Sequence, residues 1–86
     1  MNKEINVLNK LHAAFTTMPI RFRERVCEEC NYSNPTFYRK VRGVNTVENR
    51  KVIQVLSNAE KAKIREVAEE VRHELDSLVS HLINPK

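Results

Sequence analysis

Apolar residues recur at three- and four-residue steps along the first third of the chain, the spacing that gathers them on one face of an α-helix. The pattern predicts a helix over about 2–17 and another over about 20–30. Pro19 lies between them, and because proline lacks a backbone N–H we expect it to separate the two helices. The apolar stripes are Ile5, Leu8, Leu11, Phe15 and Met18 in the first helix, and Phe22, Val26, Cys27 and Cys30 in the second.

The longest apolar stripe lies in the last third of the chain. Ser57 and Glu60 have the spacing of a capping box, which predicts a helix over 57–82. Such a helix is about 37 Å long, more than a small three-helix core covers. Its stripe is Ile64, Val67, Ala68, Val71, Leu75, Leu78, Val79 and Leu82. The far part therefore needs a further partner. A homodimer through this helix is the simplest solution, and the alternative is that the helix folds back over the first one.

The segment 44–56 is rich in β-branched residues, with a polar break at Glu48, Asn49 and Arg50. This composition is typical of a short β-hairpin beside the helices, which would resemble a wing. It also fits an extended loop whose apolar residues hold it in place. Both interpretations stay open, because short apolar runs are ambiguous.

The run from Arg23 to Gly43 predicts a helix, a tight turn and a second helix over 34–42. Asn31 suits the reversal, since asparagine tolerates the left-handed conformation, and Ser33 is a good N-cap. Gly43 is expected to end the second helix. Phe37 and Val41 are four residues apart and are predicted to face the preceding helix. The opposite face then carries Asn34, Tyr38, Arg39 and Arg42.

This run resembles the helix-turn-helix of small bacterial and phage DNA-binding regulators. The resemblance rests on the small Cys27, on Asn31 where the family usually has glycine, on Tyr32 next to it, and on the similarity of 33–39 to the start of many recognition helices. Lys40 stands where the family often has an apolar residue; either Val41 takes that packing role or the helix is slightly rotated. The expected fold is all-α: one domain over 1–86, with a three-helix core at 1–43 containing the motif at 22–43, a loop or hairpin at 44–56 and the helix 57–82.

The resemblance implies that the helix 34–42 enters the major groove of duplex DNA. Arginine and asparagine are among the commonest base-reading residues there, so Asn34, Tyr38, Arg39 and Arg42 are the predicted base contacts. Ser33 and Thr36 would contact phosphates near the helix N-terminus. The further backbone contacts predicted are Arg21, Arg23, Lys40, Arg50 and Lys51. The implied role is transcriptional regulation or a function in a mobile element.

Charge supports this expectation. The chain of 86 residues has a formal charge of +4, and the segment 19–51 alone holds eight basic and four acidic residues. The positive excess therefore falls on the predicted motif and its flanks, where phosphates would be contacted. The rival hypothesis is a protein-interaction module that works through the long helix 57–82, with the helix-turn-helix as scaffold.

Other chemistry has little support in the sequence. Cys27 and Cys30 offer half of a zinc site, but they coincide with the packing face of their helix, so we expect them to be structural. Glu70 and His73 share a helix face without further ligands. No nucleophile and base are paired, and we expect neither an enzyme nor a cofactor. Two cysteines without a disulfide pattern favour the cytoplasm, and no apolar stretch predicts a membrane span.

Overall fold

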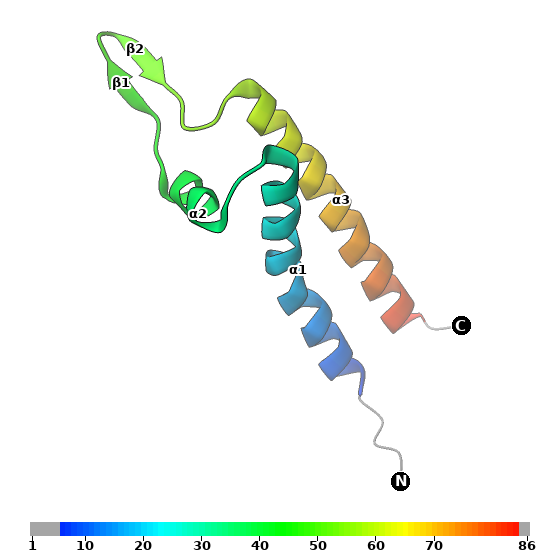
Figure 1. Ribbon diagram of the computed structural model, residues 1–86. Coiled ribbons are helices and arrows are strands. Elements are labelled where there is room, and N and C mark those ends of the chain that lie inside the picture. The colour runs from blue at the N-terminus through cyan, green and yellow to red at the C-terminus, as the bar shows by residue number, and fades with distance from the viewer. Residues whose placement is uncertain (1–5, 85–86) are drawn as a thin grey trace.

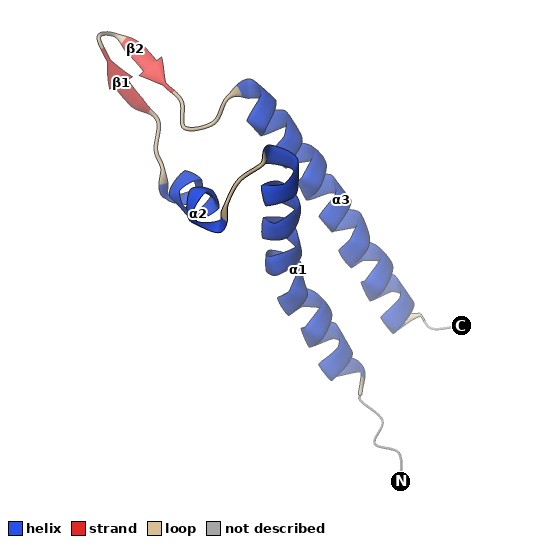
Figure 2. Ribbon diagram, in the orientation of Figure 1, coloured by secondary structure: helices blue, strands red, loops and turns tan. Residues whose placement is uncertain are grey.

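The computed structural model describes residues 6–84, which form three helices and one antiparallel β-hairpin (Figures 1 and 2). The elements are α1 (Val7–Cys30), α2 (Asn34–Arg42), β1 (Thr46–Glu48), β2 (Lys51–Ile53) and α3 (Asn58–Ile83). α1 and α3 run antiparallel and form a stem (Figure 1). α2 and the hairpin lie together at the end of the stem where α1 stops and α3 starts, and we call residues 31–57 the head. The protein is mostly helical, as predicted, and elongated, measuring 68 × 22 × 19 Å.

The prediction of two helices over 2–30 was wrong, because α1 continues through Pro19. A proline in a helix interior removes one hydrogen bond and costs about 3 kcal/mol in isolation. Here α1 packs along α3 on both sides of the proline, with Ala14 buried before it and Val26 after it, and this packing holds the helix together. Figure 1 shows α1 changing direction part-way along its length, as expected of a proline kink. α1 begins at its N-cap Asn6; the predicted turn 2–5, with Ile5, lies outside the described residues.

The core sits where the head meets the stem. Its buried side chains come from all three helices: Val26 of α1, Phe37 of α2, and Val67 and Val71 of α3. Around them pack the partly buried Met18, Phe22, Cys27, Cys30, Tyr32 and Ile64. Both cysteines are thus packed beside the core as predicted, and both are free thiols.

α3 folds back along α1, which was the alternative to covering the far part of this helix with a second copy of the chain. Two bidentate contacts cross between the helices: Arg21 Nη2 lies 2.7 Å from Glu74 Oε1, and Arg25 Nη2 lies 2.9 Å from Glu70 Oε1. Ser57 caps α3 and Glu60 reaches back to the Ser57 N–H, so the predicted capping box is confirmed. Within residues 6–84 no helix has the length and apolar character to cross a bilayer.

The segment 44–56 is a hairpin rather than a loop. Thr46, Val47 and Glu48 pair with Ile53, Val52 and Lys51. The two residues of the turn, Asn49 and Arg50, have φ values of 49° and 66°, the left-handed conformations of a type I′ turn. Every strand residue is exposed, so the hairpin projects from the head without a packed face.

Candidate nucleic-acid interface

Two capping residues define the turn between α1 and α2. Asn31 ends α1 in the left-handed conformation, with φ 57° and ψ 46°, and its N–H bonds to the Cys27 carbonyl. Ser33 caps α2, its hydroxyl oxygen accepting from the Thr36 N–H at 3.2 Å and its hydroxyl donating to Thr36 Oγ1 at 2.9 Å. These caps are the ones predicted, and they leave the Thr36 hydroxyl proton available to an acceptor outside the chain.

Two adjacent aromatic residues define the inner and outer faces of α2. Phe37 is buried in the core, while Tyr38 lies on the outer side and its ring meets that of Phe37 edge-on, with centroids 5.3 Å apart. The Arg23 guanidinium lies 6.0 Å from the Tyr38 ring centroid, and Arg23 Nη1 donates to the Tyr38 hydroxyl at 2.8 Å. This hydrogen bond raises the pKa of Arg23. Arg23 was predicted to contact phosphate; its observed contact fixes the Tyr38 side chain.

Lys40 and Val41 exchange the places predicted for them. Val41 is 64% exposed, so the expectation that it packs against α1 was wrong. Lys40 lies on the inner side instead, where its Nζ donates to the Val55 carbonyl at 2.9 Å and lies 3.5 Å from Glu60 Oε2. Lys40, and not Val41, therefore occupies the inner position, which the helix-turn-helix family often makes apolar. Its stem lines the core, and its charge is neutralised within the chain.

Glu60 joins the head to the stem. Its carboxylate accepts from the Ser57 N–H at 2.8 Å and from the Tyr32 hydroxyl, and it faces the Lys40 ammonium. These interactions, led by the Ser57 backbone bond, lower the pKa of Glu60 to about 2. Burial and the same carboxylate raise the pKa of Tyr32. Only the capping role of Glu60 was foreseeable, because nothing in the sequence pairs Tyr32 or Lys40 with it.

Four cations of the stem, Arg21, Arg25, Lys63 and Arg72, are paired with carboxylates. Arg21, a predicted backbone contact, faces α3 and donates through Nε and Nη2 to both carboxylate oxygens of Glu74. That hydrogen bond lowers the pKa of Glu74 and raises that of Arg21. Arg25 bonds to Glu70, Glu28 and Glu29 in the same way. The structure thus places Arg21 away from the outer face of α2.

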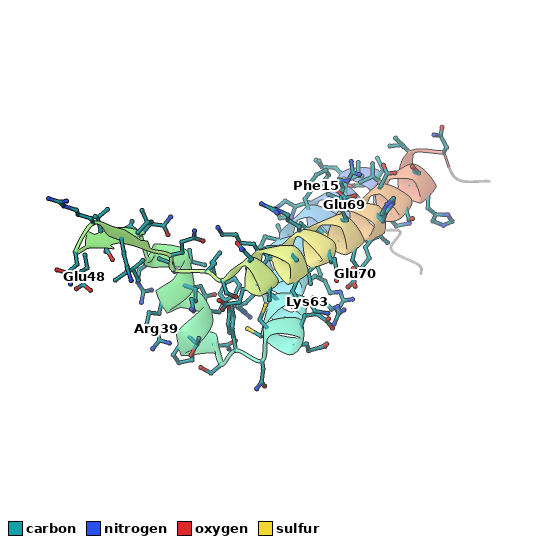
Figure 3. All side chains as sticks on the ribbon, turned by 90° about the horizontal axis from the view of Figure 1, so that it is seen from above. Phe15, Arg39, Glu48, Lys63, Glu69 and Glu70 are labelled. Atoms are coloured by element: carbon teal, nitrogen blue, oxygen red, sulfur yellow. The ribbon has the colours of Figure 1, made fainter. Side chains whose placement is uncertain are left out.

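The cations of the head are arranged differently. Arg39 and Arg42 are exposed in the last turn of α2, and Figure 3 shows Arg39 projecting outward from that helix. Arg50 and Lys51 are exposed at the hairpin tip. Among the described residues none of these four forms an ion pair. A simpler role for the α2 pair is to complement the helix dipole at a C-terminus, which needs neither DNA nor any other partner.

Asn45 and Gly43 shape the connection between α2 and the hairpin. The Asn45 side chain accepts from the Val55 N–H at 3.1 Å and closes the base of the hairpin. Gly43 ends α2 as predicted, but in an extended conformation with φ −68°. Glycine is needed at this position because a Cβ there would lie only 2.9 Å from Val55 Cγ1.

Asn34, at the start of α2, is exposed, and its Oδ1 lies 3.9 Å from Cys27 Sγ.

The chain's net charge resides in α2 and the hairpin. The twenty residues from 34 to 53 contain five basic side chains and one acidic side chain, Glu48, for a formal charge of +4, which equals that of the whole chain. The remaining residues carry equal numbers of basic and acidic groups. An uncompensated positive surface with a protruding aromatic side chain suits an anionic polymer.

Comparison with protein-family models, curated proteins and solved structures gave no match. The resemblance to helix-turn-helix regulators therefore rests on this chain's own residues.

Proposed function

We propose that the protein binds duplex DNA through the head, as a helix-turn-helix formed by the end of α1, the turn 31–33 and α2. The observation that carries the proposal is a contrast in pairing: Arg21, Arg25, Lys63 and Arg72 of the stem are paired with carboxylates, whereas Arg39, Arg42, Arg50 and Lys51 on the outer face of the head form no ion pair with a described residue. An exposed ion pair contributes little to phosphate binding, because its carboxylate repels the same anion that its cation attracts.

In the proposed complex α2 lies in the major groove. Asn34, Tyr38, Arg39 and Arg42 face base edges, with Arg23 acting through Tyr38 as a positioning residue. Ser33 and Thr36 lie at the N-terminus of α2, where backbone N–H groups and the Thr36 hydroxyl suit a phosphate. Arg50 and Lys51 at the hairpin tip contact the phosphate backbone. Arg21 and Lys40 are left out, since their charges are satisfied within the chain.

The backbone of Arg50 gives independent support. Arg50 has φ 66°, a conformation that is strained for residues other than glycine, which is favoured at this position of a type I′ turn. A guanidinium at the outermost turn of the molecule, held there against backbone preference, fits a contact made outside the chain.

The resemblance extends the proposal to sequence-specific binding and transcriptional regulation by a homodimer, since a twofold pair presents two recognition helices to one duplex. The second candidate function, a protein-interaction module, is favoured by a different observation, the apolar side chains left exposed on the stem.

Salt-dependent binding to a random-sequence duplex tests the proposal. Binding to a random sequence is electrostatic, so on this duplex all four unpaired cations of the head, Arg39 and Arg42 included, are expected to contact phosphates. They predict a slope of log affinity against log salt of about −3 to −4, or roughly 100-fold weaker binding on going from 50 to 200 mM salt. The double variant Arg39→Ala, Arg42→Ala should reduce the slope to about −2. Arg65→Ala is the matched control, because it removes an exposed stem cation for which the structure shows no ion pair, and it should leave the slope unchanged. A flat salt dependence, or equal effects of the head and stem variants, would contradict DNA binding by the head.

A further inference from the structure

The apolar stripe of α1 continues beyond the part of this helix that packs near α2. Leu8, Leu11, Phe15, Met18 and Phe22 follow alternating steps of three and four residues, so they share one face of α1. Met18 and Phe22 pack against the core that Phe37 of α2 closes. Beyond them, Phe15 is 56% exposed and Leu8 is 74% exposed. The same face of α1 is thus covered near the head and open further out.

α3 repeats this arrangement. Ile64 and Val71 belong to the core or pack against it, and the same stripe continues through Leu75, Val79 and Leu82, none of which is buried. Leu78 lies between this stripe and the polar side of α3: it lines one groove with Leu82 and with Ala14 of α1, and another with Ser77 and Glu74. Figure 3 likewise shows Phe15 and Glu70 on opposite edges of the stem. We call Leu8, Leu11 and Phe15 of α1 together with Leu75, Val79 and Leu82 of α3 the outer-stem face.

We infer that the outer-stem face binds the same face of a second copy, so that the two helix pairs form a four-helix bundle. This refines the homodimer of the proposed function but needs no DNA. The three- and four-residue steps suit helices that interlock side by side, and a second copy supplies two helices with the same steps. The surface expected from the sequence, the far part of α3 alone, is replaced by one to which both helices contribute.

The charges of this region favour a copy of the chain over other occupants. The segment 7–20 contains one charged residue, Lys10, whereas the nine residues from 21 to 29 contain six. The segment 75–84 also contains one, Asp76. Depletion of charge marks the centre of a protein interface, and one charge of each sign gives the pairing no net repulsion. An anionic membrane or nucleic acid would instead require a basic rim.

The size of the face also fits. Six large apolar side chains, partly exposed, present on the order of 500 Å² per copy, and the small residues between them bring this towards the roughly 800 Å² per partner of a standard interface. In the single chain, the buried residue of this region is Ala14, which is too small to form a core. A second copy would bury the outer-stem face, as α2 buries the part of the stem near the head.

The test is the molar mass of the full chain without DNA, measured by sedimentation equilibrium from 1 to 100 μM. The wild type should be a dimer. Phe15→Glu should raise the dimer dissociation constant by about 30-fold or more, because it would bury an unpaired carboxylate. Leu8→Glu tests the same face at the more exposed position, so at least one variant should keep its fold, as checked by circular dichroism.

Ser77→Glu is the matched control, since Ser77 is exposed beside Glu70, His73 and Glu74 on the polar side of α3, and the same charge there should leave the dimer intact. A monomeric wild type would overturn the inference. A dimer that Ser77→Glu dissociates and that neither Phe15→Glu nor Leu8→Glu dissociates would also overturn it. The result can be separated from the proposed function. A dimer that does not bind DNA would contradict only the proposed DNA binding, and a monomer that binds DNA would contradict only the proposed dimer.

Discussion

Arg25 in the stem and Arg39 in the head show how differently two regions of one small chain use the same side chain. Arg25 is bonded to Glu70, Glu28 and Glu29, and its side chain is only 20% exposed. Arg39 projects into solvent, and no ion pair joins it to a described residue (Figure 3). In the stem, arginines such as Arg21 and Arg25 hold the two helices together, whereas Arg39, Arg42, Arg50 and Lys51 of the head form no ion pair with a described residue. Pairing within the chain, rather than the count of basic residues, therefore identifies the surface suited to an anionic partner.

The largest effect is expected where the two regions join. Phe37→Ala should lower the free energy of unfolding by about 3–5 kcal/mol, because it empties a core position shared by all three helices. Val41→Ala should change it by less than about 0.5 kcal/mol, since Val41 is 64% exposed. Urea unfolding followed by circular dichroism measures both. If Val41→Ala were the more damaging change, the observed orientation of α2, with Phe37 inside and Val41 exposed, would be wrong.

Two neighbouring cations of α2 should respond in opposite ways. Arg39→Met should weaken binding to a preferred DNA site by about 1–3 kcal/mol and leave stability unchanged, because Arg39 is proposed to read a base. Lys40→Met should lower stability and leave DNA affinity unchanged, because the Lys40 ammonium bonds to Val55 and faces Glu60. Fluorescence anisotropy and thermal melting separate the two quantities. Equal loss of DNA affinity in both variants would show that intrachain pairing does not determine availability.

The Glu60 contacts should make the joint sensitive to acid. A carboxyl whose pKa is about 2 in the folded protein, against an ordinary value of 4.5, stabilises the fold above pH 4.5, and this contribution is lost as the pH falls towards 2. Glu60→Gln keeps the size of the side chain but cannot ionise. The wild type should exceed Glu60→Gln in stability at pH 6, and the difference should shrink steadily between pH 4.5 and 2. A difference that is constant with pH in urea titrations would exclude this role for the Glu60 charge.

The smallest effect is expected at the hairpin tip, where the sign of the change is informative. Arg50→Gly should stabilise the protein by about 0.5–1 kcal/mol, because glycine adopts the positive φ of this position without strain. The same change should reduce the salt slope of DNA binding by about 0.9, the share of one phosphate contact. Thermal melting and a salt titration give the two values. A destabilised variant, or an unchanged slope, would remove the case for Arg50 as a contact.

Local chemistry made part of this structure predictable. The caps at Ser33 and Ser57 and the turn at Asn31 depend on neighbouring backbone groups, so the sequence is enough to place them. Pro19 was misread because a local penalty was outweighed by packing along α3. The positions of Lys40 and Val41 were exchanged because the partners of Lys40, Val55 and Glu60, lie far along the chain and cannot be paired with it from the sequence. Whether Arg21 and Arg23 are available likewise depends on partners, Glu74 and Tyr38, that only the folded chain brings together.

The most direct test of the account is where DNA touches the folded chain. Amide chemical shifts of the ¹⁵N-labelled protein, followed during titration with a duplex at low salt, report this residue by residue. The account predicts that the largest changes fall in 33–42 and at 49–51, with the stem segment 62–83 nearly unchanged. Changes concentrated on the stem, or an absence of changes at DNA concentrations well above those of the protein, would contradict it.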